Sequence, residues 1–293
     1  MVHAASHRGP FRAIANGRPL PLDSRVLLMG VLNVTPDSFS DGGRYLDPGA
    51  AVEHAVAMQE EGADLIDVGA ESSRPGAEPV SESEEVYRLM PVLEALSARI
   101  TIPLSVDTTK AEVARRALDA GATIVNDVSA LRFDPSMGRV IADKGAGLIL
   151  MHMQGTPQTM QRNPVYHDVV GEVRQFFVER MQVASGDGIA PEQILLDPGI
   201  GFGKNLRHNL TLLANLEALG DLGRPILVGV SRKAFIGQVL DRRVGDRLLG
   251  TAAAVAMAIL HGARVIRVHD VGAMRDVVKM VEAIEKEQAR SSL

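Results

Sequence analysis

Cysteine and tryptophan are both absent from the 293 residues, and the other aromatic residues are few, with 3 Tyr and 7 Phe. Without cysteine the chain has no disulfides, thiolate metal sites, iron–sulfur clusters or cysteine nucleophiles. This absence fits a reducing compartment such as the cytoplasm. The scarcity of aromatic side chains argues against the stacking platforms that bind single-stranded nucleic acids.

A strong charge excess and a long apolar run are also missing. Lys and Arg number 31 and Asp and Glu 36, so the net charge is −5, a poor match for non-specific nucleic-acid binding. The longest apolar stretch, residues 252–260, is far shorter than the ~20 residues that cross a bilayer. Residues 1–10 contain no apolar run and do not resemble a signal peptide. We therefore expect a cytoplasmic protein with no membrane or nucleic-acid partner.

Short apolar runs alternate along the chain with stretches of helical composition. Several helical stretches end at a Gly-Ala pair just before the next apolar run, and glycine is the usual residue after a helix. The runs predicted as strands are 26–34, 65–69, 104–106, 124–128, 148–151, 194–196, 226–230 and 265–268. Helices are predicted at 48–61, 82–98, 110–120, 135–144, 168–186, 205–219, 246–261 and 271–290.

Capping signals mark some of the predicted helix starts. Ser81 with Glu84, and Thr109 with Glu112, have the spacing of a capping box. Asp134 followed by Pro135 is typical of an N-cap with proline at the first helical position.

The order of these elements predicts the fold class. The predicted strands are almost continuously apolar, as strands buried on both faces are. Eight strands that alternate with eight helices predict a single-domain (β/α)8 TIM barrel over residues 26–290. Residues 1–25 are expected to form an N-terminal segment that packs on the barrel. A doubly wound open sheet is the alternative.

Polar side chains cluster at the carboxyl ends of the predicted strands, where a barrel places its active site. Helix capping explains many of the acids, amides and hydroxyls. It does not explain the cations, because positive charge is unfavourable at a helix N-terminus. Cations facing carboxylates therefore indicate an anion site beside a hydrogen-bonding pocket. The strand-end residues are Asn33, Asp67, Glu71, Asp107, Asn126, Asp127, His152, Asp197, Ser231, Lys233, Arg267 and His269.

Three common motifs fail when they are tested against the sequence. Residues 199–204 (GIGFGK) lack the Walker spacing and the last glycine of a dinucleotide fingerprint. Residues 229–233 carry Lys where a nucleophile elbow needs Gly. His152 has no partner at metal-ligand spacing, so we interpret it as a packed or hydrogen-bonded histidine.

An ordered set of motifs resembles the dihydropteroate synthase family. Residues 33–43 (NVTPDSFSDGG) resemble its first signature and residues 66–76 (IDVGAESSRPG) its second. Matches follow in the same order at 105–108, 126–127, 151–155, 196–204, 229–233 and 267–270. The resemblance covers about residues 26–285, and this many motifs in one order is highly specific.

The resemblance implies an enzyme of folate biosynthesis on a single (β/α)8 barrel, usually a homodimer. It implies that 6-hydroxymethyl-7,8-dihydropterin diphosphate is joined to 4-aminobenzoate, giving 7,8-dihydropteroate and pyrophosphate. Sulfonamides imitate 4-aminobenzoate, so the chain is expected to be a sulfonamide target. The expected step is dissociative, with Mg²⁺ assisting pyrophosphate departure and no covalent enzyme intermediate.

The resemblance also implies roles for individual residues. Asp107, Asn126 and Asp197 would hydrogen-bond the pterin ring, and Lys233 would contact its carbonyl. Met151 and Phe202 would form apolar walls. Arg267 and His269 would hold the diphosphate, with Asn33 also binding Mg²⁺. The expected catalytic residues are Asn33, Asp41, Arg74, Lys233, Arg267 and His269, and loops carrying Phe39, Asp41, Ser73, Arg74 and Pro75 would shape the aminobenzoate pocket.

Two positions depart from the family pattern. Ser73 stands where Thr is usual, and Ala234 stands where Ser often follows the conserved Lys. The second change puts aminobenzoate affinity and the sulfonamide response in doubt. A pterin-dependent methyltransferase and a catalytically silent pterin-binding homologue are the alternatives, although neither requires both the 33–43 loop and the Arg267-x-His269 pair.

Overall fold

The computed structural model describes residues 19–22, 24–35, 48–72 and 76–291. Parallel strands form a closed barrel in which each strand pairs with the next and β8 pairs with β1. This closure confirms the (β/α)8 prediction and excludes the open sheet. The strands are β1 Leu27–Asn33, β2 Leu65–Gly69, β3 Leu104–Asp107, β4 Ile124–Asp127, β5 Gly147–Met151, β6 Ile194–Asp197, β7 Ile226–Gly229 and β8 Ala263–Val268.

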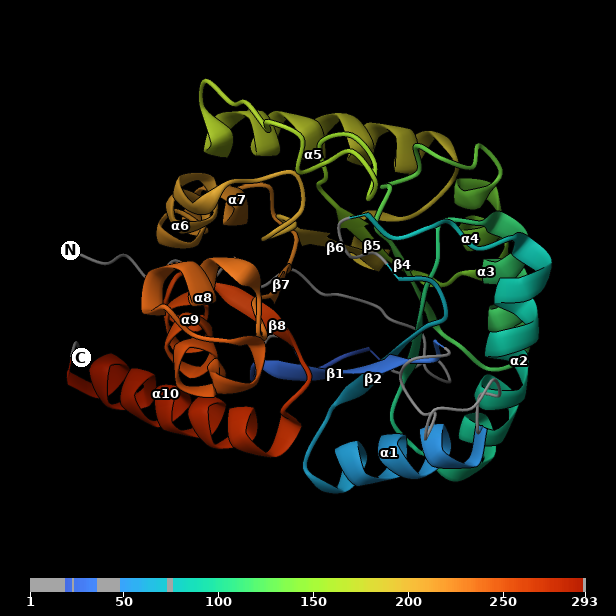
Figure 1. The fold of residues 1–293 in the computed structure, drawn as a ribbon, viewed down its shortest axis with the longest axis horizontal. Helices are drawn as coiled ribbons and strands as arrows, with labels where there is room; N and C mark the ends of the chain where they lie inside the picture. The colour runs from blue at the N-terminus through green and yellow to red at the C-terminus, as the bar shows by residue number, and fades with distance from the viewer. Residues whose placement is uncertain (1–18, 23, 36–47, 73–75, 292–293) are drawn as a thin grey trace.

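Helices surround the strands, as Figure 1 shows. Gly62, Gly121, Gly145 and Gly262 all have positive φ, which confirms the predicted change of direction between helix and strand. The helices are α1 Pro48–Glu60, α2 Glu82–Arg99, α3 Ala111–Asp119, α4 Met137–Lys144, α5 Val169–Gly186, α6 Leu206–Ala214, α7 Glu217–Gly220, α8 Ala234–Leu240, α9 Leu248–Leu260 and α10 Val271–Ser291, with 3-10 turns at Pro191–Gln193 and Val244–Asp246.

Apolar side chains fill the barrel interior and the space between strands and helices. Leu27, Leu65, Ile149 and other strand residues form the inner cluster. Leu20 and Leu22 belong to that cluster. Because residues 1–18 and 23 lie outside the described residues, the packing of the whole 1–25 segment stays a prediction. None of the helices in the described ranges is long and apolar enough to cross a membrane.

The helix predictions were wrong in two places. The single helix predicted at 205–219 is divided into α6 and α7, and Asn215 lies between them outside helical geometry, with ψ 28°. The helix α8 was not predicted after β7. It has only 7 residues, a length that carries little periodicity.

Two of the capping predictions were also wrong. The helix α3 begins at Ala111 without a side-chain cap from its own N-cap residue. Asp134 does not cap its own helix directly, since α4 begins at Met137. Instead, its Oδ2 accepts a hydrogen bond from Ala111 N at 2.8 Å. One carboxylate from the β4–α4 loop therefore caps the neighbouring helix. Ser81 does cap α2, accepting from Glu84 N at 3.2 Å.

Candidate active site

An arginine between two carboxylates occupies the carboxyl end of the barrel. Arg267 on β8 donates from Nε to Asp67 Oδ2 at 2.7 Å and from Nη2 to Asp107 Oδ2 at 3.1 Å. Asn126 Nδ2 donates to the same Asp67 oxygen at 2.9 Å. The barrel thus brings together side chains from β2, β3, β4 and β8.

Burial and neighbouring charges shift the pKa values of the acidic and basic groups in this cluster. Burial and the charge of Asp67 raise the pKa of Asp107, while Arg267 opposes the rise. Burial disfavours the charge on Arg267, but the two carboxylates outweigh it and raise the pKa of the guanidinium. Two buried oxygens, Asp67 Oδ1 and Asn126 Oδ1, have no hydrogen-bond partner in the described structure. These two oxygens can therefore accept hydrogen bonds from a ligand that carries N–H or O–H groups.

A second group lies at the ends of β6 and β7. Asp197 Oδ1 accepts a hydrogen bond from Gly199 N at 2.7 Å, and burial raises the pKa of Asp197. Lys233 Nζ lies 4.3 Å from the centre of the Phe202 ring and donates to Ile200 O. Burial lowers the pKa of Lys233 to about 8 although Asp197 opposes the shift. Met151 is 2% exposed and packs in an apolar cluster that Phe202 adjoins.

The remaining described site residues lie on neighbouring strand ends. Asn33 ends β1 and is in register with Gly69 of β2. His269 follows β8, and its Nδ1 lies 3.0 Å from Ser231 Oγ. Ser231 also accepts from His269 N at 3.2 Å, so it sets the position of this histidine. Phe39, Asp41, Ser73, Arg74 and Pro75 lie outside the described residues.

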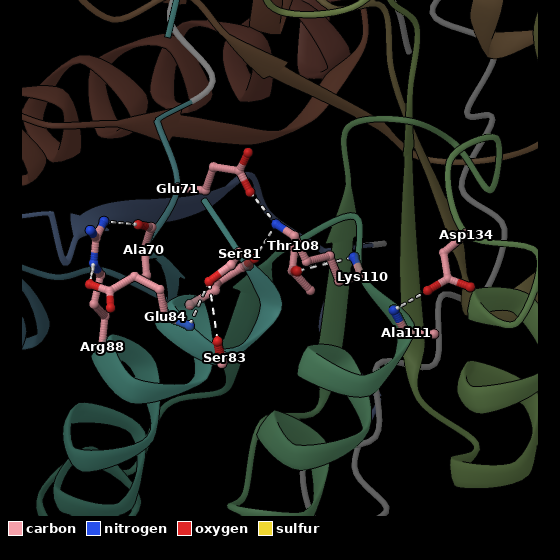
Figure 2. A network of polar contacts seen from close by, with 11 residues as sticks. Ala70, Glu71, Ser81, Ser83, Glu84, Arg88, Thr108, Lys110, Ala111 and Asp134 are labelled. Atoms are coloured by element: carbon pink, nitrogen blue, oxygen red, sulfur yellow. Dashed lines mark hydrogen bonds and ion pairs between the residues drawn. The ribbon is translucent and has the colours of Figure 1, made fainter. Parts of the chain in front are cut away.

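Lys110 bridges two acidic side chains at the base of the loop after β2. Its Nζ donates to Glu71, which Figure 2 shows, and to Glu85 Oε2 at 2.5 Å. Glu85 lies on α2 and is 0% exposed, and burial raises its pKa against the effect of Lys110. Arg88 Nη1 supports the same loop by donating to Ala70 O at 3.2 Å (Figure 2). This network ties β2, β3 and α2 together beside Asp107.

A cavity of about 260 Å³ borders this network, with Asp107, Thr108, Lys110, Val128 and Phe133 among its walls. A larger depression of about 600 Å³ lies between α2 and α3, lined by residues such as Tyr87 and Arg116. The smaller cavity is the relevant one, because only it reaches a side chain of the strand-end cluster.

His152 and Lys204 form a buried pair below the site. Lys204 Nζ lies 2.9 Å from His152 Nδ1, and burial together with Lys204 lowers the histidine pKa to about 2. This agrees with the interpretation of His152 as a hydrogen-bonded histidine. Across the described residues, no group of three His, Asp or Glu is placed to hold a metal ion.

The predicted site residues that fall within the described ranges lie at the same end of the barrel. Other residues of the site were not assigned a role from the sequence. Asp67 was noted at a strand end yet given no role, although it joins Arg267 to Asn126. A signal existed, since Asp67 is a charged residue inside an apolar strand. Lys204 was set aside when its motif failed. Asp127 accepts hydrogen bonds from Ser129 N and Leu131 N in the β4–α4 loop, so it fixes that loop and does not cap α4, which begins at Met137.

Comparison with known proteins agrees with this geometry. The profile of the family described as "Pterin binding enzyme" matches residues 29–269. Dihydropteroate synthase from Synechocystis sp. is 50% identical over 261 residues, covering 89% of this chain and 90% of that protein.

Two solved structures of Xanthomonas albilineans dihydropteroate synthase are similar throughout. The structure with 4-aminobenzoic acid has a TM-score of 0.88 at 46% identity, covering 94% of this chain and 99% of that one. The complex with 7,8-dihydropteroate has a TM-score of 0.83 at 44% identity, covering 92% and 97%. With these matches over nearly its whole length, the chain belongs to the dihydropteroate synthase family of pterin-binding transferases.

Proposed function

We propose that this chain joins 6-hydroxymethyl-7,8-dihydropterin diphosphate to 4-aminobenzoate and releases pyrophosphate. The observation that carries the proposal is the grouping of Asp107, Asn126, Asp197, Lys233 and Arg267 at one end of the barrel. Relatives solved with 4-aminobenzoic acid and with 7,8-dihydropteroate support the same substrates and product.

The pterin ring is a flat heterocycle with N–H donors along one edge and a carbonyl on another. Asp107, Asn126 and Asp197 supply acceptors for the donor edge, and Lys233 supplies a donor for the carbonyl. The unpartnered oxygen of Asn126 supports this assignment, since a buried acceptor without a donor is costly. Phe202 and Met151 provide apolar surface against the ring faces.

The diphosphate is assigned to the cationic side of the site. Arg267 is already oriented by Asp67 and Asp107, so little side-chain entropy is lost when it meets phosphate oxygens. Its forked donors match those oxygens in geometry. Ser231 holds His269 beside them.

Mg²⁺ is proposed at Asn33. The described residues offer no cluster of three acidic or histidine ligands, so they do not supply a cage made only of protein. A single amide oxygen fits Mg²⁺, which commonly takes one or two protein oxygens and completes its shell with phosphate oxygens and water. Bound there, the ion would neutralise charge on the diphosphate.

In the proposed reaction the bond between the exocyclic carbon and the diphosphate oxygen breaks, and the electron pair leaves with pyrophosphate. The amine nitrogen then bonds to the delocalised pterin cation and loses a proton. Arg267 and His269 stabilise the leaving group electrostatically, and the pterin contacts hold the carbon in place for the amine. The aminobenzoate roles of Phe39, Asp41, Ser73, Arg74 and Pro75 stay predictions.

A coupled assay tests the function. Purified protein with Mg²⁺ and the pterin diphosphate is expected to release pyrophosphate only when 4-aminobenzoate is added, with dihydropteroate confirmed by mass. Pyrophosphate release that forms no dihydropteroate although 4-aminobenzoate is present would locate the defect on the aminobenzoate side, where Ala234 lacks a hydroxyl. Pterin binding without any release would contradict the proposal.

Substitution of Arg267 tests the diphosphate assignment. Arg267→Ala is expected to lower kcat/KM for the pterin diphosphate by about 100-fold, a size typical for removing an electrostatic stabiliser. Arg139→Ala is the matched control, because that side chain is 75% exposed and pairs with Asp143 on its own helix. Equal turnover in the two variants would remove Arg267 from the mechanism.

A further inference from the structure

The loop between β6 and α6 is held by side chains at every carbonyl from Gly199 to Gly203. The donors come from four different places in the chain. Gly199 O and Phe202 O accept from Lys204 Nζ at 3.0 and 2.9 Å, Ile200 O accepts from Lys233 Nζ, Gly201 O accepts from Gln161 Nε2 at 2.6 Å, and Gly203 O accepts from Tyr166 Oη at 2.8 Å. We call residues 199–203 the carbonyl loop.

Lys204 is the centre of this arrangement. Its side chain is 3% exposed, and Nζ donates to two carbonyls of the loop and to His152 O at 3.3 Å. With His152 Nδ1 at 2.9 Å, these carbonyls surround Nζ with four polar atoms, at least as many as its donors can serve. Burial lowers the pKa of Lys204, although Asp197 opposes the shift. Burying such a group costs free energy unless hydrogen bonds compensate for the water it loses.

The carbonyl loop fits tightly against the β5 end. A Cβ at Gly199 would lie 1.9 Å from His152 O, and one at Gly203 would lie 2.9 Å from Gln154 backbone atoms. The backbone of the carbonyl loop is therefore packed directly against the backbone that follows β5. Lys204 bridges the two segments by donating to Gly199 O and to His152 O.

Three pterin-site side chains depend on the same backbone. Asp197 accepts from Gly199 N at 2.7 Å, Phe202 belongs to the loop, and Lys233 donates to Ile200 O. A Cβ at Gly201 would lie 3.0 Å from Lys233 Cδ, so the lysine stem also packs on the loop. Lys204 itself is buried beneath these groups and presents almost no surface of its own.

We propose that Lys204 is a positioning residue for pterin recognition, which sets Asp197, Phe202 and Lys233 by fixing the carbonyl loop against His152. This inference rests on the proposed function. It explains why a lysine lies in the core here, because an apolar residue would leave the carbonyls of Gly199, Phe202 and His152 without this donor.

Lys204→Met tests the inference, since it keeps the length of the stem and removes the donors. Binding of 6-hydroxymethyl-7,8-dihydropterin, which lacks the leaving group, is measured by calorimetry alongside steady-state kinetics. The pterin Kd and the KM for the pterin diphosphate are expected to rise about tenfold, as when one or two net hydrogen bonds are lost. The KM for 4-aminobenzoate is expected to stay within about twofold.

A merely structural role gives a different pattern, with less folded enzyme and lower apparent kcat at unchanged pterin Kd. That result would overturn the inference. Lys204→Arg retains charged donors and is expected to recover part of the affinity. Failure of the proposed function is separate, because it would appear as absent turnover in the unmodified protein.

Gln161→Ala provides a second variant if Lys204→Met does not fold. Gln161 is exposed, and its substitution removes the hydrogen bond to the Gly201 carbonyl. The pterin Kd of the variant is therefore expected to rise about twofold to threefold. Gln175→Ala is the matched control, because that exposed glutamine bonds Glu179 on α5 and does not touch the loop. A pterin Kd equal to that of the control would overturn the inference.

Discussion

Lys233 lies at the carboxyl end of the barrel, and its pKa is lowered. Its Nζ lies over the Phe202 ring, and burial brings its pKa to about 8 against the pull of Asp197. A lysine in this range changes charge close to physiological pH, so the hydrogen bond proposed between Lys233 and a pterin carbonyl is expected to depend on pH. The sign follows from chemistry, because the charged form below pH 8 is the better donor.

Pterin affinity is therefore expected to fall as pH rises through 8. The Kd for 6-hydroxymethyl-7,8-dihydropterin should rise about fivefold between pH 8 and 9.5, because one charged hydrogen-bond donor is lost. In Lys233→Arg, which stays charged, that step should disappear even if affinity is lower throughout. Titration of Asp107 is common to both proteins, so the difference between the two calorimetric profiles isolates Lys233. Parallel profiles would contradict the assignment.

The start of α2 and the start of α3 are joined by Lys110. Glu85 is fully buried on α2, and its charge is balanced by Lys110 from the β3–α3 turn. Asp134 adds a cap to α3 from the next loop. The positions of two helices and of the loop after β2 therefore depend on a few polar contacts rather than on apolar packing alone.

Lys110→Met is expected to lower the free energy of unfolding by about 3–5 kcal/mol, because it leaves a buried carboxylate without its cation. Adding Glu85→Gln should recover part of the loss. Urea unfolding at pH 7 measures both. Burial raises the folded-state pKa of Glu85, so its protonation relieves the cost and the deficit should narrow as the pH falls below 7.

Arg115→Met is the control for this prediction. Arg115 lies on the same helix α3, but its side chain is 44% exposed and its partners are Glu112 and Asp119 on the surface. Its loss should lower the free energy of unfolding far less than the loss of Lys110, because exposed ion pairs contribute little. An equal loss of unfolding free energy in the two variants would contradict the prediction that Lys110 compensates a buried carboxylate.

The assembled barrel exposes apolar side chains on α8, α9 and the turn between them. Leu249 at the start of α9 is 84% exposed, and α8, α9 and the turn between them carry further exposed apolar residues, namely Val239, Leu240, Val244, Leu248, Met257 and Leu260. Apolar surface of this kind marks interaction sites. The homodimer expected from the family resemblance is therefore predicted to use this surface.

Leu249→Glu is expected to shift the protein from dimer to monomer, because a desolvated carboxylate in the interface is costly. Sedimentation velocity measures the change. Val165→Glu is the control, since Val165 is 56% exposed but lies in the β5–α5 loop. A monomeric unmodified protein, or equal behaviour of both variants, would contradict this location.

Local patterning was enough to predict the strands and most helices. Buried parallel strands need apolar runs, and a glycine with positive φ follows α1, α3, α4 and α9, so both signals are contained in neighbouring residues. The motifs likewise placed the described site residues at strand ends. The short helix α8 and the break at Asn215 escaped prediction because neither leaves a periodic signal.

Which side chains meet was decided by closure of the barrel. Leu27 of β1 is in register with Val265 of β8, and the same closure brings Arg267 to Asp67 and Asp107. The partners of Lys204 and Lys110 also come from separate loops. Pairing between such distant positions depends on strand register and burial, and these exist only after the chain has folded.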